Sequence, residues 1–444
     1  MLTLRPYQSE AITVIEREGS LILADDCGLG KTLVGIETAH ACNSWPVLVV
    51  CNNSARRQWE TMIHDQYPND SIMLSNKIPW DYEKMRSQSL LQWVIASWDE
   101  LTMKSAASFF QVVWPLIIAD EVHKAKNRIA KRTQALKKIL AIRKLGLSAT
   151  PYEHSDEVWS LLNWLDPYQF PGYWAWVQRY FNMVDNYYSM QKQAGELKDP
   201  EAFQRLLAPW VLRRTKEQVL PDLPPKIEIP TFVGMTPQQK AMYNTLAQSK
   251  DVVVQLGDQD QDQDIVILNA LALLTKLQQV STSPKLITPD TQEQGTKLRW
   301  VDDHVNDNPH RKVVFFTRFI QTAKWIAESL GCECLAEGKG DPTFFQKGLH
   351  KYVVGTIDSM GESLDFPMAD DAVFVETHWS SIKMQQAIDR VHRSNIVSPK
   401  NIYFLLSSRT DKRILKAAQD KIDERRMALE FARARPEEMV ESES

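Results

Sequence analysis

The sequence lacks the features of a secreted or membrane protein. It has only five cysteines among 444 residues, and no pair has the spacing of a zinc site. We therefore expect a reduced, intracellular protein without structural disulfides. The first residues contain no charged stretch followed by an apolar one, so we expect no signal peptide. No apolar run is long enough to cross a bilayer, which argues against a membrane partner.

An excess of positive charge is also missing. The net charge is -4, and no lysine- and arginine-rich cluster has the pattern of a nuclear signal. A nucleic-acid site would therefore have to be a local basic groove. The length and the hydrophobic content of 43% predict two or three folded domains.

Short apolar runs alternate with amphipathic stretches in two parts of the chain. Buried strands that alternate with helices are typical of a parallel α/β sheet, and the stretch 130–141 has helical spacing. The expected strands are 20–24, 46–51, 93–97, 116–119 and 144–147, followed by a second set at 312–316, 352–355, 372–376 and 401–406. The fold class we predict is α/β, with two parallel-sheet lobes.

The middle of the chain has a different pattern. Residues 156–210 are rich in aromatic side chains at helical spacing, which favours a helical core over bases stacked on exposed rings. Two prolines at 222–225 mark a linker, 237–248 and 265–279 are expected to be helices, and the acidic stretch 257–264 is expected to be an exposed loop. The predicted organisation is a first lobe at 1–215 with a helical protrusion at about 152–205, a linker and second protrusion at 216–290, a second lobe at 291–436 and an acidic tail at 437–444.

A phosphate-binding loop follows the first expected strand. Glycines let backbone N–H groups approach phosphate oxygens, and the helix that follows adds its positive N-terminal end. Lys31 would reach the β- and γ-phosphates of ATP, and Thr32 would hold Mg²⁺. A glycine-rich turn with a chance Gly-Lys-Thr is the alternative, which the flanking strand and helix disfavour. We expect ATP to contact Asp25, Asp26, Cys27, Gly28, Leu29, Gly30, Lys31 and Thr32.

An acidic pair stands at the end of the strand 116–119. Carboxyl ends of parallel strands form the catalytic edge of such a sheet. Asp120 would bind Mg²⁺ through the second coordination shell, and Glu121 would orient and deprotonate the attacking water. A solvated strand end is the alternative, although the phosphate loop about ninety residues upstream makes it less favourable.

Two arginines near the end of the chain have a spacing suited to phosphate. Arg390 and Arg393 lie three residues apart, which would place both on one face of a helix. A planar guanidinium matches phosphate oxygens, and such a group can stabilise the transition state of phosphoryl transfer. A solvated basic helix face is the alternative. We expect both arginines to be catalytic, together with Lys31, Asp120 and Glu121.

These motifs together resemble Swi/Snf-type ATPases of helicase superfamily 2. Residues 25–32 match six of the eight residues of the family's Asp-Glu-Met-Gly-Leu-Gly-Lys-Thr loop, and 120–123 resembles its Asp-Glu-x-His box. Residues 385–393 resemble its Gln-Ala-x-x-Arg-x-His-Arg helix, and 212–216 its Leu-Arg-Arg-x-Lys element. The resemblance covers about 3–408, and around 374–379 it is nearest the annealing-helicase branch. It implies two RecA-like lobes with helical protrusions.

The resemblance also implies further site residues. Gln8 would select adenine, and Ser148, Thr150 and Gln386 would couple the ATP site to DNA. Contacts with DNA phosphates would come from segments 51–59, 96–101 and 124–127 and from the loop before the arginine helix. Trp59 is better explained as a core anchor, and Arg56 and Arg57 as surface charges. The expected DNA contacts are Asn52, Ser54, Ser97, Lys124 and Gly361.

The loop before the arginine helix departs from the family pattern. Ser363 replaces the usual second glycine, and Asp365 replaces the usual asparagine. Asp365 would repel a phosphate if it faced one. The assignment of this loop to DNA is therefore weaker than that of the ATP site.

The function we expect is an ATP-driven motor on double-stranded or branched DNA, with ATP and Mg²⁺ as cofactors. It would be a monomer in the cytoplasm of a prokaryote or of a virus-infected cell. A strand-separating helicase on DNA or RNA is one alternative. A non-catalytic DNA scaffold is the other, but Lys31, Glu121 and both arginines are retained.

Overall fold

A computed structural model describes residues 2–74, 91–185, 192–248, 263–291, 293–337, 340–360 and 364–430. The chain divides into two compact units. Unit 1 comprises Met1–Pro221 with Asp423–Ser444, and unit 2 comprises Asp222–Ile422. The acidic stretch expected as a loop lies outside the described residues except for its last two positions, 263 and 264, which begin a helix. The acidic tail lies wholly outside them.

Unit 1 is built on a parallel sheet with helices on both faces. Among the described residues the strand order is β3-β4-β2-β5-β6-β1-β9. The strands are β1 (Ser20–Leu23), β2 (Val47–Cys51), β3 (Ile72–Leu74), β4 (Trp93–Ser97), β5 (Val113–Asp120), β6 (Leu140–Leu147) and β9 (Val211–Leu212). The helices are α1 (Pro6–Glu18), α2 (Lys31–Ala41), α3 (Arg56–Gln66), α5 (Lys131–Lys138), α6 (Val158–Leu165), α7 (Tyr173–Tyr180), α8 (Pro200–Leu207) and α9 (Lys216–Val219).

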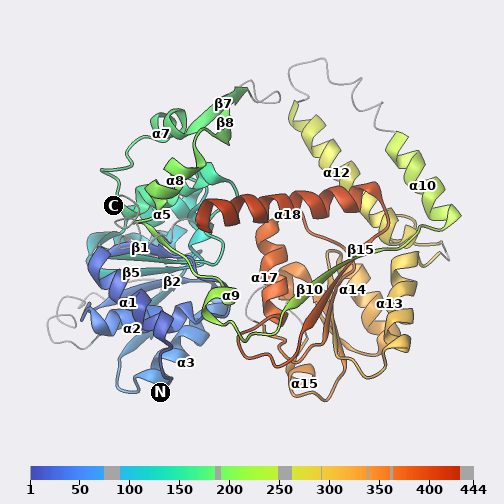
Figure 1. The fold of residues 1–444 in the computed structure, drawn as a ribbon, viewed down its shortest axis with the longest axis horizontal. Coiled ribbons are helices and arrows are strands. Elements are labelled where there is room, and N and C mark those ends of the chain that lie inside the picture. Colours follow the sequence, from blue (N-terminus) through green and yellow to red (C-terminus); the bar gives the residue numbers. More distant parts are fainter. Residues whose placement is uncertain are drawn as a thin grey trace, which may run out of the picture. The chain divides into compact units, whose positions relative to one another are not determined.

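Both faces of this sheet are covered by apolar side chains. Leu48 and Val50 of β2 pack with α5, α6 and α8, whereas Val47 and Val49 pack with α1, α2 and α3. Figure 1 shows α1 to α3 on one side of the sheet and α5 and α8 on the other. Burial on both faces explains why these strands are continuous apolar runs instead of alternating ones.

Unit 2 repeats this architecture. Among the described residues its parallel strands have the order β10-β15-β14-β11-β13-β12. They are β10 (Lys226–Phe232), β11 (Val313–Thr317), β12 (Glu333–Leu335), β13 (Tyr352–Thr356), β14 (Asp371–Phe374) and β15 (Lys400–Leu406). The helices are α10 (Pro237–Gln248), α12 (Gln263–Thr282), α13 (Thr296–Asp307), α14 (Ile320–Leu330), α15 (Thr343–Gln346), α16 (Ile357–Met360), α17 (Ser381–Val391) and the larger part of α18 (Arg409–Glu430), which belongs to unit 1 from Asp423 on. The prediction of two parallel α/β lobes is confirmed.

Several local predictions need correction. The expected helix 130–141 ends at Lys138, because Leu140 and Ala141 already pair with β5 as part of β6. The aromatic segment is not wholly helical, since β7 (Phe181–Asp185) and β8 (Lys192–Leu197) form an antiparallel hairpin within it. Its role as core is confirmed for Trp164, Phe170 and Trp176, which are buried.

Candidate ATP-binding site

Three neighbouring strands carry the main motifs to one edge of the unit 1 sheet. The order β5-β6-β1 places the acidic pair, the segment 147–151 with the coupling residues Ser148 and Thr150, and the phosphate loop at adjacent strand ends. Leu147 lies level with Asp120 on one side and with Leu23 on the other. Residues about ninety positions apart in the sequence are therefore brought together at the carboxyl edge of the sheet.

The phosphate loop has the backbone that its glycines suggest. Gly28 and Gly30 have φ of 84° and 78°, in a region that L side chains rarely adopt. A Cβ on Gly30 would lie 2.4 Å from Nε2 of Gln8, so a side chain at this position would have to displace the Gln8 amide. Helix α2 begins at Lys31, whose ammonium donates to the carbonyls of Asp25 at 2.7 Å and Asp26 at 3.2 Å.

The two aspartates of the loop face arginines of the same unit. Asp25 is fully buried, and its Oδ1 accepts from both the backbone N–H and the Nε of Arg214 at 3.0 Å. Asp26 accepts from Nη2 of Arg213 at 3.3 Å and from the backbone N–H of Lys216 at 3.0 Å. Their carboxylates fasten the loop to the Leu-Arg-Arg element, and the expected contact of these two residues with ATP stays a prediction.

The same arginines reach two other motifs. Arg214 also donates to the carbonyl of Tyr7, and Arg213 donates to the carbonyl of Ala149 at 3.1 Å. Both arginines are buried. Residues 213–214 therefore join the N-terminal segment, the phosphate loop and the 147–151 segment, a role that the family resemblance did not suggest.

Gln8 makes contacts within the protein that the sequence did not predict. Its Oε1 accepts from the backbone N–H of Arg5 at 2.9 Å, and its Nε2 donates to the carbonyl of Leu29 at 3.0 Å. The side chain is buried. The Oε1 end thus caps the start of α1, and the Nε2 end joins α1 to the phosphate loop. The amide keeps a second N–H and a second oxygen lone pair, so an adenine contact stays a prediction.

The acidic pair combines burial with an unusual backbone. Asp120 is the last residue of β5, and Glu121 has φ 50° and ψ 50°, a left-handed conformation that costs a residue of this type about 1–3 kcal/mol. Burial, followed by the negative charge of Glu121, raises the pKa of Asp120 to about 6, although the Trp59 indole and Lys31 oppose this rise. Such conformations concentrate at functional sites.

Two indoles hold Asp120 in place. Nε1 of Trp59 donates to its Oδ2 at 2.9 Å, and Nε1 of Trp98 donates to its backbone carbonyl at 2.9 Å. The sequence interpretation of Trp59 as a core anchor is confirmed, since the residue is 1% exposed. Its polar contact was missed, because a tryptophan on a helix gives no sequence signal for the acceptor of its N–H group.

His123 lies between the acidic pair and the segment 147–151. Its Nδ1 is 3.2 Å from Oε2 of Glu121 and 3.2 Å from Oγ of Ser148. The backbone N–H of Thr150 also donates to Ser148 at 3.2 Å, and Thr150 is buried. The structure therefore brings Ser148 and Thr150 to the acidic pair, through a histidine that sequence reasoning left without a role.

The two arginines of unit 2 share one acidic partner. Nη1 of Arg390 lies 3.3 Å from Oδ1 of Asp365, and Nη2 of Arg393 pairs with the same oxygen. Helix α17 ends at Val391, so Arg393 follows the helix instead of lying on its face as predicted. Gln386 lies on α17 and is partly exposed.

The expected DNA contacts differ in accessibility. Ser54 is exposed, and Asn52 and Lys124 are partly exposed. Ser97 is buried, and its hydroxyl accepts from the N–H of Glu100 at 3.2 Å, so a direct phosphate contact is not supported there. Gly361 lies outside the described residues.

Arg56 also departs from its expected role as a surface charge. Its Nη1 pairs with Oε1 of Glu100 at 2.7 Å, and its side chain is only 16% exposed. Arg57 is exposed, as expected. Arg56 thus links the start of α3 to the segment 96–101.

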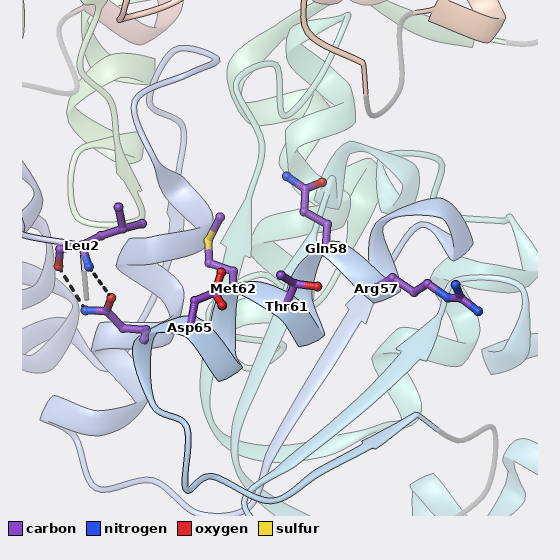
Figure 2. Close-up of a pocket in the computed structure, with 7 residues that line it drawn as sticks. Leu2, Arg57, Gln58, Thr61, Met62 and Asp65 are labelled. Atoms are coloured by element: carbon purple, nitrogen blue, oxygen red, sulfur yellow. Dashed lines mark hydrogen bonds between the residues drawn. The ribbon is translucent and has the colours of Figure 1, made fainter. Parts of the chain in front are cut away.

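A pocket of about 500 Å³ lies on another part of unit 1 (Figure 2). Gln66 hydrogen-bonds both backbone groups of Leu2 beside it, at 2.7 and 3.1 Å. The lining residues are Leu2, Arg57, Gln58, Thr61, Met62, Asp65 and Gln66. No residue of the phosphate loop or of the acidic pair is among them.

The donor set at the strand edge is compatible with Mg²⁺ and a nucleotide. Mg²⁺ keeps several waters and is usually bound by one or two protein oxygens together with phosphates. Thr32 at the start of α2 and Asp120 at the end of β5 are oxygen donors of this kind. Within the described part of the chain, no group of three or more His, Cys, Asp or Glu side chains could hold a metal alone. In that part, no helix has both the length and the apolar character needed to cross a membrane.

The fold and the motif geometry define a RecA-like P-loop protein with two lobes. A family model described as the SNF2-related domain matches residues 7–286, and one described as the helicase conserved C-terminal domain matches residues 296–395. The chain belongs to the SNF2-related family, since the first match covers more than half of it. The resemblance to Swi/Snf-type ATPases is confirmed.

Two curated relatives of the chain are distant in sequence and longer than it. The chain is 25% identical over 433 residues to the DNA annealing helicase and endonuclease ZRANB3 of Bos taurus, covering 92% of this chain and 38% of the relative. It is 24% identical to the uncharacterized ATP-dependent helicase MG018 of Mycoplasma genitalium, covering 92% and 40%. A solved structure, the Sulfolobus solfataricus SWI2/SNF2 ATPase core in complex with dsDNA, is 22% identical with a TM-score of 0.45 and 97% coverage of both chains. The chain spans about two fifths of the length of the two relatives.

Proposed function

We propose that this chain is an ATP-hydrolysing motor that moves along double-stranded DNA, remodelling branched DNA or displacing bound proteins. The observation that carries the proposal is the meeting of Lys31, Glu121 and Ser148 at three adjacent strand ends. Membership of the SNF2-related family supports it. So do the names of its relatives, which include a DNA annealing helicase and an ATP-dependent helicase.

The proposed chemistry is hydrolysis of the γ-phosphate of ATP. The glycines at 28 and 30 and the start of α2 would bind the phosphates, with Lys31 leaving the loop carbonyls to contact the β- and γ-oxygens. Thr32 and Asp120 would hold Mg²⁺, which when bound neutralises phosphate charge. Glu121 would accept a proton from the attacking water. Arg390 and Arg393 would stabilise the charge of the transition state.

DNA would be bound through its phosphates, without reading of bases. Exposed Ser54 and partly exposed Asn52 and Lys124 are the described candidates for these contacts. The contact of His123 with both Glu121 and Ser148 would carry the coupling between DNA and hydrolysis. Gln386 on α17 would take part from unit 2.

The test is a comparison of ATP turnover with duplex DNA, single-stranded DNA, branched DNA and RNA. Duplex or branched DNA should stimulate turnover more than single strands of equal length, and salt should weaken binding steeply. A Glu121→Gln variant should keep ATP binding and lose hydrolysis, because an amide cannot take the proton; this control attributes the activity to the chain.

Other outcomes of the same comparison would contradict the proposal. Stimulation by RNA or single strands alone would favour a strand-separating helicase. DNA binding without any ATP turnover would favour a scaffold. Loss of nucleotide binding in Glu121→Gln as large as the loss of turnover would make Glu121 a binding residue.

A further inference from the structure

We propose that Trp59 and Trp98 are positioning residues that connect the DNA-contact segments to Asp120 of the ATP site. This inference rests on the proposed function and names the route by which DNA would regulate the site. Trp59 belongs to the segment 51–59, and Trp98 belongs to the segment 96–101. Both N–H groups end on the same residue, one on the Asp120 carboxylate and one on its backbone carbonyl, each at 2.9 Å.

Neither indole can act by touching DNA. Trp59 is 1% exposed and Trp98 is 2% exposed. Trp59 lies in α3 and packs against Gly35 of α2. The contact is close, since a Cβ added to Gly35 would lie 3.3 Å from the Trp59 ring. A movement of α3 is therefore transmitted to Asp120 through a closely packed ring, since packed interiors have little free space.

The two segments are also fastened to each other. Arg56 pairs with one carboxylate oxygen of Glu100 at 2.7 Å, and the other oxygen accepts from the N–H of Ser97 at 2.7 Å. The backbone N–H of Trp98 donates to the backbone carbonyl of Cys51 at 3.0 Å. A phosphate bound at Asn52 or Ser54 would thus order both segments together, and both lead to Asp120.

Asp120 is where such a link would matter most. Its carboxylate is the proposed Mg²⁺ group, and its backbone leads directly into Glu121, whose N–H donates to Oδ1 of Asp120 at 3.0 Å. The Trp59 bond fixes the orientation of the carboxylate, and the Trp98 bond fixes the peptide before the strained Glu121. Together they define where metal and attacking water would lie.

The chain contains a matched control for each bond. Trp93 is fully buried in the same sheet, and its Nε1 donates to Oδ2 of Asp70 at 2.8 Å, away from the acidic pair. Trp114 is fully buried, and its Nε1 donates to the carbonyl of Phe109 at 3.2 Å. Replacement of any of these four residues by Phe keeps an aromatic ring and removes one N–H donor.

The experiment measures ATP turnover with and without duplex DNA in the full chain. Trp59→Phe should lower the stimulation ratio about tenfold, because a hydrogen bond to a charged group is lost, and Trp98→Phe about threefold. DNA affinity without nucleotide should be unchanged. Trp59→Phe should also reduce the gain in ADP affinity that Mg²⁺ provides. Trp93→Phe and Trp114→Phe should keep the wild-type stimulation ratio and Mg²⁺ dependence.

The outcomes separate this inference from the proposed function. If wild-type turnover does not respond to any DNA, both are overturned. If the wild type is stimulated but Trp59→Phe and Trp98→Phe respond like their controls, only the inference is overturned. The two bonds come from different elements, so each can be tested separately. If Trp59→Phe does not fold, Trp98→Phe and its control Trp114→Phe still test the inference, and the reverse also holds.

Discussion

The charged groups proposed for the ATP site are held in contrasting ways in the two units. In unit 1, fully buried Asp25 pairs with buried Arg214, and Asp120 is held by two buried indoles. In unit 2, Arg390 and Arg393 both pair with Asp365, whose side chain is 52% exposed. Surface ion pairs are weak and easily exchanged, whereas a buried pair is costly to break. The difference suggests a preassembled nucleotide site and a pair of arginines that can change partners.

The largest effect should come from the arginines themselves. Arg390→Ala or Arg393→Ala should lower DNA-stimulated ATP turnover by about 10³–10⁵-fold, the range of an arginine acting on the transition state. ATP affinity without DNA should change much less, because the proposed phosphate contacts belong to unit 1. Turnover and equilibrium nucleotide binding should be measured on the same preparation. Wild-type turnover in both variants would make residues 385–393 an ordinary solvated segment.

The next effect concerns stability. Arg214→Met should destabilise unit 1 by about 3–5 kcal/mol, since the carboxylate of Asp25 would stay buried without its cation. Asp365→Asn should change the stability of unit 2 by no more than about 1 kcal/mol, because the Asp365 carboxylate is more than half exposed to solvent. Urea unfolding measures both. Adding Asp25→Asn to Arg214→Met should recover part of the loss; equal destabilisation by Arg214→Met and Asp365→Asn would remove the contrast between the units.

The smallest effect concerns turnover in Asp365→Asn. The carboxylate competes with phosphate for both arginines, so its neutralisation should raise DNA-stimulated turnover by up to about fivefold. Glu337→Gln is a suitable control, because Glu337 forms a surface pair with Lys324 at the same 3.3 Å. A fall in turnover with Asp365→Asn alone would mean that the carboxylate positions the arginines.

The sequence predicts the central strands of both lobes and the motifs at their ends, because buried parallel strands give continuous apolar runs. It does not predict β3, β9 and β12, whose two or three residues are too few for a pattern, nor β10, which alternates in exposure and falls in the expected linker. It also fails for side-chain partners distant in the chain. Asp25 and Arg214 are 189 positions apart, and Trp59 and Asp120 are 61 apart. These contacts depend on the order of the strands, which periodicity alone does not give.

Family resemblance also does not predict the protein contacts of a motif residue. Asp25 and Asp26 were expected to contact ATP, which stays a prediction, and their carboxylates face Arg214 and Arg213. Ser97 was expected at DNA and is buried against Glu100. A motif predicts which positions have a functional role, but the partner of each side chain is set by the tertiary structure.

The most direct test of the central claim is ATP turnover with saturating duplex DNA for the wild type and for Lys31→Ala. The ammonium of Lys31 is the charge proposed to contact the β- and γ-phosphates. We expect DNA-stimulated turnover in the wild type and its abolition in the variant, with DNA binding retained. Near-normal turnover in a folded Lys31→Ala protein would contradict the assignment of residues 25–32 as the ATP-binding loop.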